Sequence, residues 1–270
     1  MVRVGFIGLG SMGRPMSEHV LAAGHRLTVF DADSQAMAPL VQAGASAAAS
    51  LTELAEVSDV ILLIVPTDED VLEVAEAMLE GARPNTVIAI CSSTRPETCI
   101  RAAALATPHS VGVVDAPVAR GVRGAQAGDL TVFAGGEAAE IEKCRPVFDA
   151  FAGHVFHMGP LGAGQITKTA NNLIHWLEVV GIYEALRLGA ASGVHPNKLR
   201  PALLAGSVES RTLRELDLVG LAWPHKDMEN ALEMAAASDT RIPLMEKVGE
   251  LVVQMSRDDL RALFIEQEYA

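Results

Sequence analysis

Residues 4–31 read VGFIGLGSMGRPMSEHVLAAGHRLTVFD, and this stretch decides the fold. It begins with a short apolar run and continues with three glycines spaced G-x-G-x-x-G. An amphipathic segment then leads into a second apolar run at 27–30, which ends at Asp31. Runs of this length and order predict a strand, a glycine-rich turn, a helix and a second strand. Together they predict the first half of a dinucleotide-binding unit.

The three glycines have separate tasks in such a turn. Gly8 would make the tight turn, Gly10 would let the backbone approach a pyrophosphate, and Gly13 would let the helix pack closely on the strand. We expect the phosphates to bind the N–H groups at the positive end of the helix that begins near Met12. The predicted cofactor contacts in this turn are Gly8, Leu9, Gly10, Ser11, Met12 and Gly13.

The carboxylate of Asp31 bears on the choice of cofactor. It stands 18 residues after Gly13, where an acid at the end of the second strand binds the ribose hydroxyls. An anion at this position repels a 2′-phosphate, and no arginine follows in residues 32–35. The sequence therefore predicts NAD as the cofactor, with NADP less favoured.

The composition is that of a globular protein, because 50% of the 270 residues are hydrophobic and 20% are charged. A formal net charge of −13 leaves no basic surface for nucleic acid, which we exclude as a partner. Three cysteines without metal-ligand spacing predict reduced thiols and no metal site. No apolar run approaches the ~18 residues of a membrane span and no leader pattern is evident, so we expect a cytoplasmic protein without membrane contact.

Helix and strand patterns alternate after the first unit. Helices are predicted at 34–43, 51–57, 68–81 and from 96 onward, and strands at 60–65, 86–90, 111–114, 130–133 and 155–157. Only helical patterns remain later, at 165–192, after 196, and near 208–216, 226–237 and 242–255. The sequence thus predicts an α/β protein with a Rossmann-like domain at 1–161 and an all-helical domain at 162–270, joined by a long helix.

Ligands bind at the carboxyl edge of a parallel sheet, so the residues that follow strands are candidate site residues. Val65, Pro66 and Thr67 end one buried strand and are predicted to line the cofactor cleft. Thr94 follows the next strand. Either Thr94 or Arg95 could begin the helix that Pro96 opens. The hydroxyl of Thr94 could contact the cofactor or cap this helix, and capping is the commoner role.

Lys168 and Asn172 are the most informative residues of the long helix. They are four positions apart and therefore lie on one face. A lysine beside a cofactor cleft is a natural proton donor, and the amide of Asn172 could hold a substrate oxygen. On spacing alone, however, such a pair is more often part of a solvated surface.

Four motifs give the chain a resemblance to a known family. They are GFIGLGSMGRPM at 5–16, DAPV at 115–118, GAGQITKTANN at 162–172, and Lys226 followed by Asp227. Over nearly its whole length the chain resembles the β-hydroxyacid dehydrogenase family, the group that includes 3-hydroxyisobutyrate dehydrogenase and tartronate semialdehyde reductase.

The resemblance implies a cleft between the two domains where NAD(P) meets a small 3-hydroxy acid, which is interconverted with its 3-oxo form by hydride transfer. It implies Lys168 as the general acid/base, Asn172 as a substrate ligand and Lys226 as a cofactor contact. The loop that would hold the substrate carboxylate through backbone amides comprises Val118, Ala119, Arg120 and Gly121. The family's cofactor contacts also include the positions of Val65, Pro66 and Thr94.

The substrate loop departs from the family's usual Ser-Gly-Gly. Ala119 lacks the hydroxyl that could donate to a carboxylate, whereas the guanidinium of Arg120 could clamp one with two hydrogen bonds. A substrate with a second acidic group, or one larger than hydroxyisobutyrate, is one hypothesis. The equal alternative is that Arg120 points to solvent or pairs with a protein acid. The segment before Lys226 is also shorter than usual, which leaves the size of the substrate open.

Two other functions compete with a hydroxyacid dehydrogenase. An imine reductase shares the fold but usually lacks a lysine at the position of Lys168, and a catalytically silent nucleotide-binding module would have lost the proton donor. Lys168 argues against the imine reductase. Lys168 and Asn172 together argue against the silent module, although the altered loop leaves it open. The size and apolar content of the helical domain predict a homo-oligomer, either a dimer or a tetramer.

Overall fold

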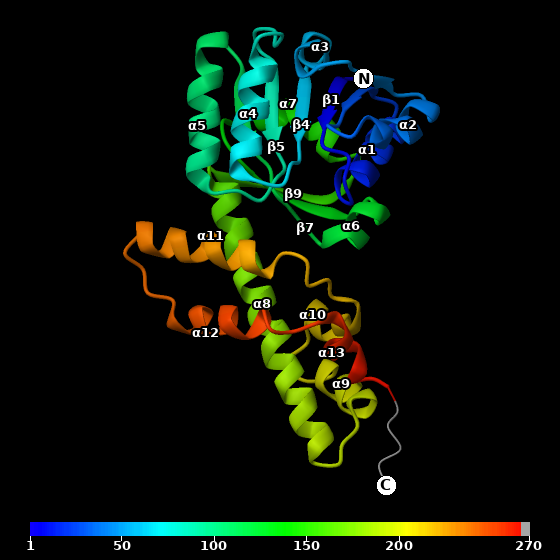
Figure 1. The fold of residues 1–270 in the computed structure, drawn as a ribbon, viewed down its shortest axis with the longest axis vertical. Helices are drawn as coiled ribbons and strands as arrows, with labels where there is room; N and C mark the ends of the chain where they lie inside the picture. The colour runs from blue at the N-terminus through cyan, green and yellow to red at the C-terminus, as the bar shows by residue number, and fades with distance from the viewer. Residues whose placement is uncertain (266–270) are drawn as a thin grey trace. The chain divides into compact units, whose positions relative to one another are not determined.

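The chain forms two compact units, Met1–Lys168 and Thr169–Ala270, in a computed structural model that describes residues 1–265. The first unit holds a nine-stranded sheet with helices on both faces, and the described part of the second contains only helices and turns (Figure 1). The predicted fold class, a Rossmann-like α/β domain followed by a helical one, is confirmed.

The sheet of the first unit is parallel over its first six strands and mixed beyond them. The strands are β1 (Arg3–Ile7), β2 (Arg26–Phe30), β3 (Ser46–Ala47), β4 (Val60–Leu63), β5 (Val87–Ile90), β6 (Gly112–Asp115), β7 (Val118–Ala119), β8 (Leu130–Gly135) and β9 (Ala152–Gly159). Their order is β3-β2-β1-β4-β5-β6-β8-β7, with β8 antiparallel to β6 and β7, and β9 parallel to β8. The order reverses between β1 and β4, which is the switch point where open sheets of this kind bind ligands.

Alternating side chains of the central strands build a core on each face of the sheet. Phe6 and Leu62 pack with α1 (Gly13–Ala22) and α7 (Ala138–Phe148) on one face. Ile61 and Ile88 pack with α3 (Leu51–Glu56), α4 (Asp68–Leu79) and α5 (Pro96–Ala106) on the other. Burying a side chain of this size contributes about 1.5–3 kcal/mol, so strands that are apolar at every position favour this three-layer arrangement. The helices and the 3₁₀ turn are α1 (Gly13–Ala22), α2 (Ser34–Gln42), α3 (Leu51–Glu56), α4 (Asp68–Leu79), α5 (Pro96–Ala106), η1 (Thr107–His109), α6 (Gly121–Ala127) and α7 (Ala138–Phe148).

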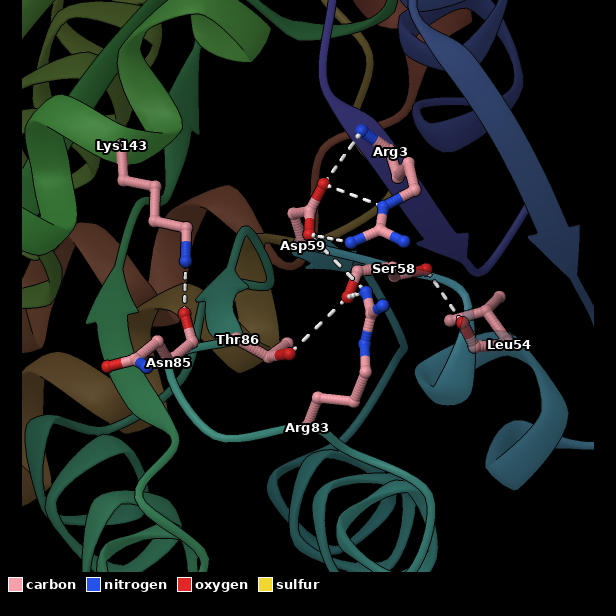
Figure 2. A network of polar contacts seen from close by, with 8 residues as sticks. All are labelled: Arg3, Leu54, Ser58, Asp59, Arg83, Asn85, Thr86 and Lys143. Atoms are coloured by element: carbon pink, nitrogen blue, oxygen red, sulfur yellow. Dashed lines mark hydrogen bonds and ion pairs between the residues drawn. The ribbon is translucent and has the colours of Figure 1, made fainter.

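A polar network fastens the segments that enter the sheet at its amino edge (Figure 2). Arg3 donates to Asp59 through Nη2 at 2.6 Å and Nε at 3.0 Å, and this hydrogen bonding holds the pKa of Asp59 below its ordinary value. The carbonyl of Ser58 accepts from Arg83 Nη2 at 2.9 Å and from Thr86 Oγ1 at 3.3 Å. The network thus lies at the sheet edge opposite the one where ligands are expected.

The helices of the second unit pack around a small apolar core. The long helix α8 (Ala163–Ala191) starts in the first unit and continues into the second, where Trp176 packs with Leu216 and Met228. The indole Nε1 of Trp176 donates to Asp227 at 3.0 Å. The other helical elements are α9 (Pro196–Leu204), α10 (Arg211–Arg214), η2 (Leu216–Leu218), α11 (Pro224–Ala237), α12 (Pro243–Val252) and α13 (Arg257–Ala262).

Several predicted boundaries differ from the observed ones. The strand predicted at 60–65 ends at Leu63, and β3, β7, α6, α7 and α13 were not predicted. The compact units divide after Lys168, within α8, while the domain boundary after Leu161 stays a prediction. Across residues 1–265 no helix combines the length and the apolar character needed to cross a membrane.

Candidate functional site

The glycine-rich turn between β1 and α1 lies at the switch point. Gly8 has a φ of +90°, and a Cβ there would lie 2.1 Å from the carbonyl oxygen of Ile64. A Cβ on Gly13 would lie 1.9 Å from the oxygen of Gly8. The protein's own packing therefore requires glycine at both positions.

Gly10 differs from its two neighbours in this respect. It is exposed, its φ lies outside the left-handed region, and no atom lies within 4 Å of a Cβ built on it. The fold itself therefore does not require glycine at position 10, whereas a group that approaches the backbone closely would. A dinucleotide pyrophosphate is such a group, and the turn fits it.

The start of α1 suits a negatively charged group. The helix begins at Gly13 with Met12 as its N-cap, and its first turn holds no acidic residue. Its first N–H groups and its dipole favour an anion, and the phosphate contacts themselves stay predictions. Leu9 is buried while Ser11 is exposed, so the side chain of Ser11 is the accessible one in this turn.

The carboxylate of Asp31 is held directly against the glycine-rich turn. One oxygen accepts from the N–H of Leu9 at 2.6 Å, and the other accepts from the N–H of Asp33 at 2.9 Å. These bonds fix the acid at the end of β2, next to the turn. This is the place predicted for the ribose hydroxyls of the cofactor.

Substitutions at Gly10 and Gly13 test the ligand requirement separately from the packing requirement. We expect Gly10→Ala to leave the melting temperature within about 2 °C of wild type and to weaken NAD+ binding by about tenfold or more, because its Cβ meets the ligand and not the protein. Gly13→Ala should instead cost about 1–3 kcal/mol of stability, because its Cβ meets backbone. Calorimetric titration with NAD+ and thermal unfolding of both variants measure the two effects. Unchanged NAD+ affinity in Gly10→Ala would remove the turn from the binding site.

Side chains cross-link the carboxyl ends of β4 and β5. The hydroxyl of Ser92 accepts from the N–H of Val65 at 2.8 Å and donates to its carbonyl at 2.9 Å. Pro66 is exposed, and Thr67 makes a capping box with Asp70 at the start of α4. Val65 is therefore held through its backbone, while the hydroxyl of Thr67 is engaged in the cap.

Of the two residues predicted to begin α5, Thr94 and Arg95, the structure uses Arg95, so the expected capping by Thr94 is wrong. The N-cap is Arg95, whose side chain makes no capping bond and whose N–H donates to the carboxylate of Asp68 at 3.1 Å. Thr94 is buried, and its hydroxyl lies 3.5 Å from the sulfur of Cys99. Burial raises the pKa of Cys99 to about 12, so the thiol stays neutral. Within residues 1–265, no group of three or more His, Cys, Asp or Glu side chains is arranged to hold a metal ion.

Two buried polar side chains that the sequence did not single out fix the start of α8. Asp115 is fully buried, and its two carboxylate oxygens accept from the N–H groups of Gly162 and Gln165, each at 2.7 Å. Burial raises the pKa of Asp115, and these amide bonds oppose the rise. The side chain of Gln165 accepts from the N–H of Thr94 at 3.1 Å and donates to the carbonyl of Ser92 at 2.8 Å. The first turn of α8 is thereby bonded to the ends of β5 and β6.

Lys168 and Asn172 follow on this helix. Lys168 stands three positions after Gln165 and so lies on the same face of α8. Asn172 is one turn further on, in the second unit, and its side-chain oxygen accepts from Asn171 at 3.2 Å. Lys226 lies in the first turn of α11, also in the second unit. The roles of these three residues stay predictions.

The loop predicted to bind the substrate carboxylate has an unusual backbone. Val118 and Ala119 form β7, and Arg120 and Gly121 then adopt left-handed conformations with φ of +87° and +61°. The guanidinium of Arg120 forms an ion pair with Asp129. Arg120 was predicted either to clamp a substrate acid or to point to solvent or pair with a protein acid. In the structure it pairs with a protein acid.

Comparisons with known proteins agree with this architecture. Residues 3–159 match the family model of the NAD-binding domain of 6-phosphogluconate dehydrogenase. Residues 162–263 match the model described as NAD-binding of NADP-dependent 3-hydroxyisobutyrate dehydrogenase. The two models together span nearly the whole chain.

Individual relatives are similar over nearly their full lengths. The chain is 32% identical to an NAD-dependent L-serine dehydrogenase of Pseudomonas aeruginosa, over 100% of this chain and 96% of the relative. It is 30% identical to 2-(hydroxymethyl)glutarate dehydrogenase of Eubacterium barkeri, over 97% and 93%. The structure of a 3-hydroxyisobutyrate dehydrogenase from Mycobacterium tuberculosis with L-serine aligns with a TM-score of 0.88 at 28% identity, over 98% of both chains. With these matches on both units, the chain belongs to the β-hydroxyacid dehydrogenase family.

Proposed function

We propose that this enzyme interconverts a small 3-hydroxy acid and its 3-oxo acid, with NAD as the hydride carrier and Lys168 as the general acid/base. The observation that carries the proposal is the anchoring of α8. Gln165 is bonded to Ser92 and Thr94 at the carboxyl end of β5, and Lys168 follows on the same helix face. This supports the proposal, because the helix that carries Lys168 starts at the same edge of the sheet as the open glycine turn at Gly10.

In the oxidative direction the protein's residues would act on the substrate hydroxyl. NAD+, when bound, supplies the acceptor for the hydride that leaves the carbon bearing this hydroxyl. Lys168 takes the hydroxyl proton as the carbonyl forms and returns it in the reverse reaction. Asn172 binds the substrate, and the backbone amides at 118–121 bind its carboxylate.

The relatives support a 3-hydroxy acid as the substrate class. L-serine and 3-hydroxyisobutyrate, which appear in the names of two of them, both carry a hydroxyl at C3 and a carboxylate at C1. 2-(Hydroxymethyl)glutarate has the same arrangement and a second carboxylate. Asp129 already pairs with the guanidinium of Arg120, so the second carboxylate of a diacid would compete with Asp129 for this group. We therefore propose monocarboxylic 3-hydroxy acids first and diacids second.

The test is NAD+ reduction by the purified chain, followed by absorbance, with 3-hydroxyisobutyrate, L-serine, glycerate, threonate and 2-(hydroxymethyl)glutarate. NADP+ runs in parallel. We expect turnover of at least one monoacid with NAD+. Faster turnover of the diacid than of the monoacids would favour binding of its second carboxylate by Arg120 in competition with Asp129. Cofactor binding without turnover of any acid would favour the silent module, and reduction of a cyclic imine with NADH would favour the imine reductase. A cytoplasmic location and a homo-oligomeric state also stay predictions.

Cofactor preference is expected to depend on the charge of Asp31. Asp31→Asn retains one oxygen for the N–H of Leu9, loses the acceptor of the Asp33 N–H, and removes the charge that repels a 2′-phosphate. We expect the ratio of kcat/KM with NAD+ to kcat/KM with NADP+ to fall by about tenfold, equivalent to about 1.4 kcal/mol. Asp33→Asn makes the same charge change two residues away and should alter the ratio less. Equal ratios in wild type and Asp31→Asn would mean that Asp31 does not select the cofactor.

A further inference from the structure

We propose that Gln165 is a positioning residue, whose carboxamide sets the place of Lys168 relative to the cofactor-side ends of β4 and β5. The inference rests on the proposed function, because Lys168 is its predicted general acid/base. Gln165 would not touch the reacting atoms. It would act through the first turn of α8.

Both the oxygen and the nitrogen of the Gln165 carboxamide are hydrogen-bonded to the backbone that follows β5. It is 1% exposed, its Oε1 accepts from the N–H of Thr94 at 3.1 Å, and its Nε2 donates to the carbonyl of Ser92 at 2.8 Å. The hydroxyl of Ser92 in turn bonds both backbone groups of Val65. A continuous series of hydrogen bonds therefore connects Val65 and Thr94, two predicted cofactor contacts, to Gln165.

The backbone of Gln165 is fixed as well, because its N–H donates to the buried carboxylate of Asp115 at 2.7 Å. With side chain and backbone both bonded, the helix start has little freedom to rotate or slide. Lys168 is three residues on, about 4.5 Å along the axis of an α-helix and on the same side. Small displacements of a reacting group are costly, since about 1 Å can lower a rate 10²-fold. Loss of the Gln165 hydrogen bonds would therefore lower the catalytic rate.

Gln165→Met keeps the length of the side chain and removes both hydrogen bonds. We expect kcat to fall about tenfold or more with the best substrate of wild type, while KM for NAD+ changes less than about twofold. Hydrogen exchange at the amide of Thr94 and in the first turn of α8 should become faster in the free protein. Thr86→Val is the matched control, because it removes a buried hydroxyl bond at the amino edge of the same sheet (Figure 2). Its kcat and its exchange at these amides should equal those of wild type.

Gln165→Glu keeps the inference testable if Gln165→Met does not fold. A protonated carboxyl can accept from Thr94 and donate to Ser92 as the amide does, whereas the ionised form cannot donate. Burial favours the protonated form. The ratio of kcat in Gln165→Glu to kcat in wild type should therefore rise as the pH is lowered. A purely structural role would leave this ratio flat in protein that remains folded.

The outcomes separate the inference from the proposed function. If wild type turns over a 3-hydroxy acid and Lys168→Ala does not, but Gln165→Met has wild-type kcat or Gln165→Glu shows a flat ratio, then the positioning role is wrong and the proposed function stands. If Lys168→Ala is as active as wild type, the proposed function itself fails. In that case faster exchange at Thr94 in Gln165→Met would still show that Gln165 fixes the helix start.

Discussion

Lys168→Ala is expected to lower kcat by about 10²–10⁴-fold, the range that a positioned acid/base group contributes. The loss should appear with every substrate that wild type oxidises, because the proton transfer is common to all of them. The dissociation constant for NAD+ should stay within about twofold of wild type, since the glycine turn and Asp31 are unchanged. Absorbance assays of NADH formation and calorimetric titration with NAD+ measure the two quantities.

Lys247→Ala is the control for the removal of a lysine as such. Lys247 is exposed on α12, where it pairs with Glu250 at 2.6 Å, and exposed pairs contribute about 0–1 kcal/mol. Its turnover should match wild type. If Lys168→Ala retained more than about a tenth of wild-type kcat, general acid/base catalysis by Lys168 would be untenable, because the loss would fall short of the expected range.

The parts of the fold that follow local rules could be predicted from the sequence. The turn could be recognised because the positions of Gly8 and Gly13 have no room for a Cβ, so that glycines recur there at a fixed spacing. The strands β4 and β5 were recognisable because burial on both faces requires an unbroken apolar run. The family resemblance added the order of the two domains and the candidate roles of Lys168 and Asn172.

Four of the elements that were missed, α6, α7, β3 and β7, lack a strong local pattern. Helix α7 holds Pro146, which normally breaks a helix, and α6 contains Gly121 and Gly124, which have low helix propensity. The strands β3 and β7 have two residues each, too few for any periodicity to appear. Tertiary packing forms these elements, and it is not visible in a window of ten residues.

The site could be predicted only in part, for a similar reason. Asp115 and Gln165 stood inside quoted motifs, but their partners are 47 to 73 residues away in the chain. A single sequence shows neither the burial of a polar side chain nor what it bonds. The expected cap at Thr94 was wrong for the same reason, because the N–H of Arg95 donates to Asp68, the first residue of α4, which is distant in the chain.

Asp115→Ala is expected to destabilise the first unit by about 2–6 kcal/mol, because two buried N–H groups lose their acceptors at about 1–3 kcal/mol each. Both tryptophans, Trp176 and Trp223, lie in the second unit, so their fluorescence follows that unit in urea while far-ultraviolet circular dichroism follows both. The dichroism transition should move to lower urea by more than the fluorescence transition does. Asp149→Ala breaks an exposed ion pair with Arg145, and it should lower the free energy of unfolding derived from either transition by no more than about 1 kcal/mol.

Asp115→Asn tests how protonation of the Asp115 carboxylate changes the stability of the folded chain. Burial is the largest influence on Asp115 and raises its pKa in the folded chain above the ordinary 3.8. The folded state therefore holds this proton more tightly than the unfolded state, so protonation favours folding. The resulting stabilisation is fully present below pH 3.8 and is lost as the pH rises through the folded-state pKa. Asparagine does not titrate, so the stability of wild type minus that of Asp115→Asn should be larger at pH ~5 than at pH ~7 in urea unfolding. A difference that shrinks on acidification would mean that the two amide bonds outweigh burial and hold the folded-state pKa below 3.8.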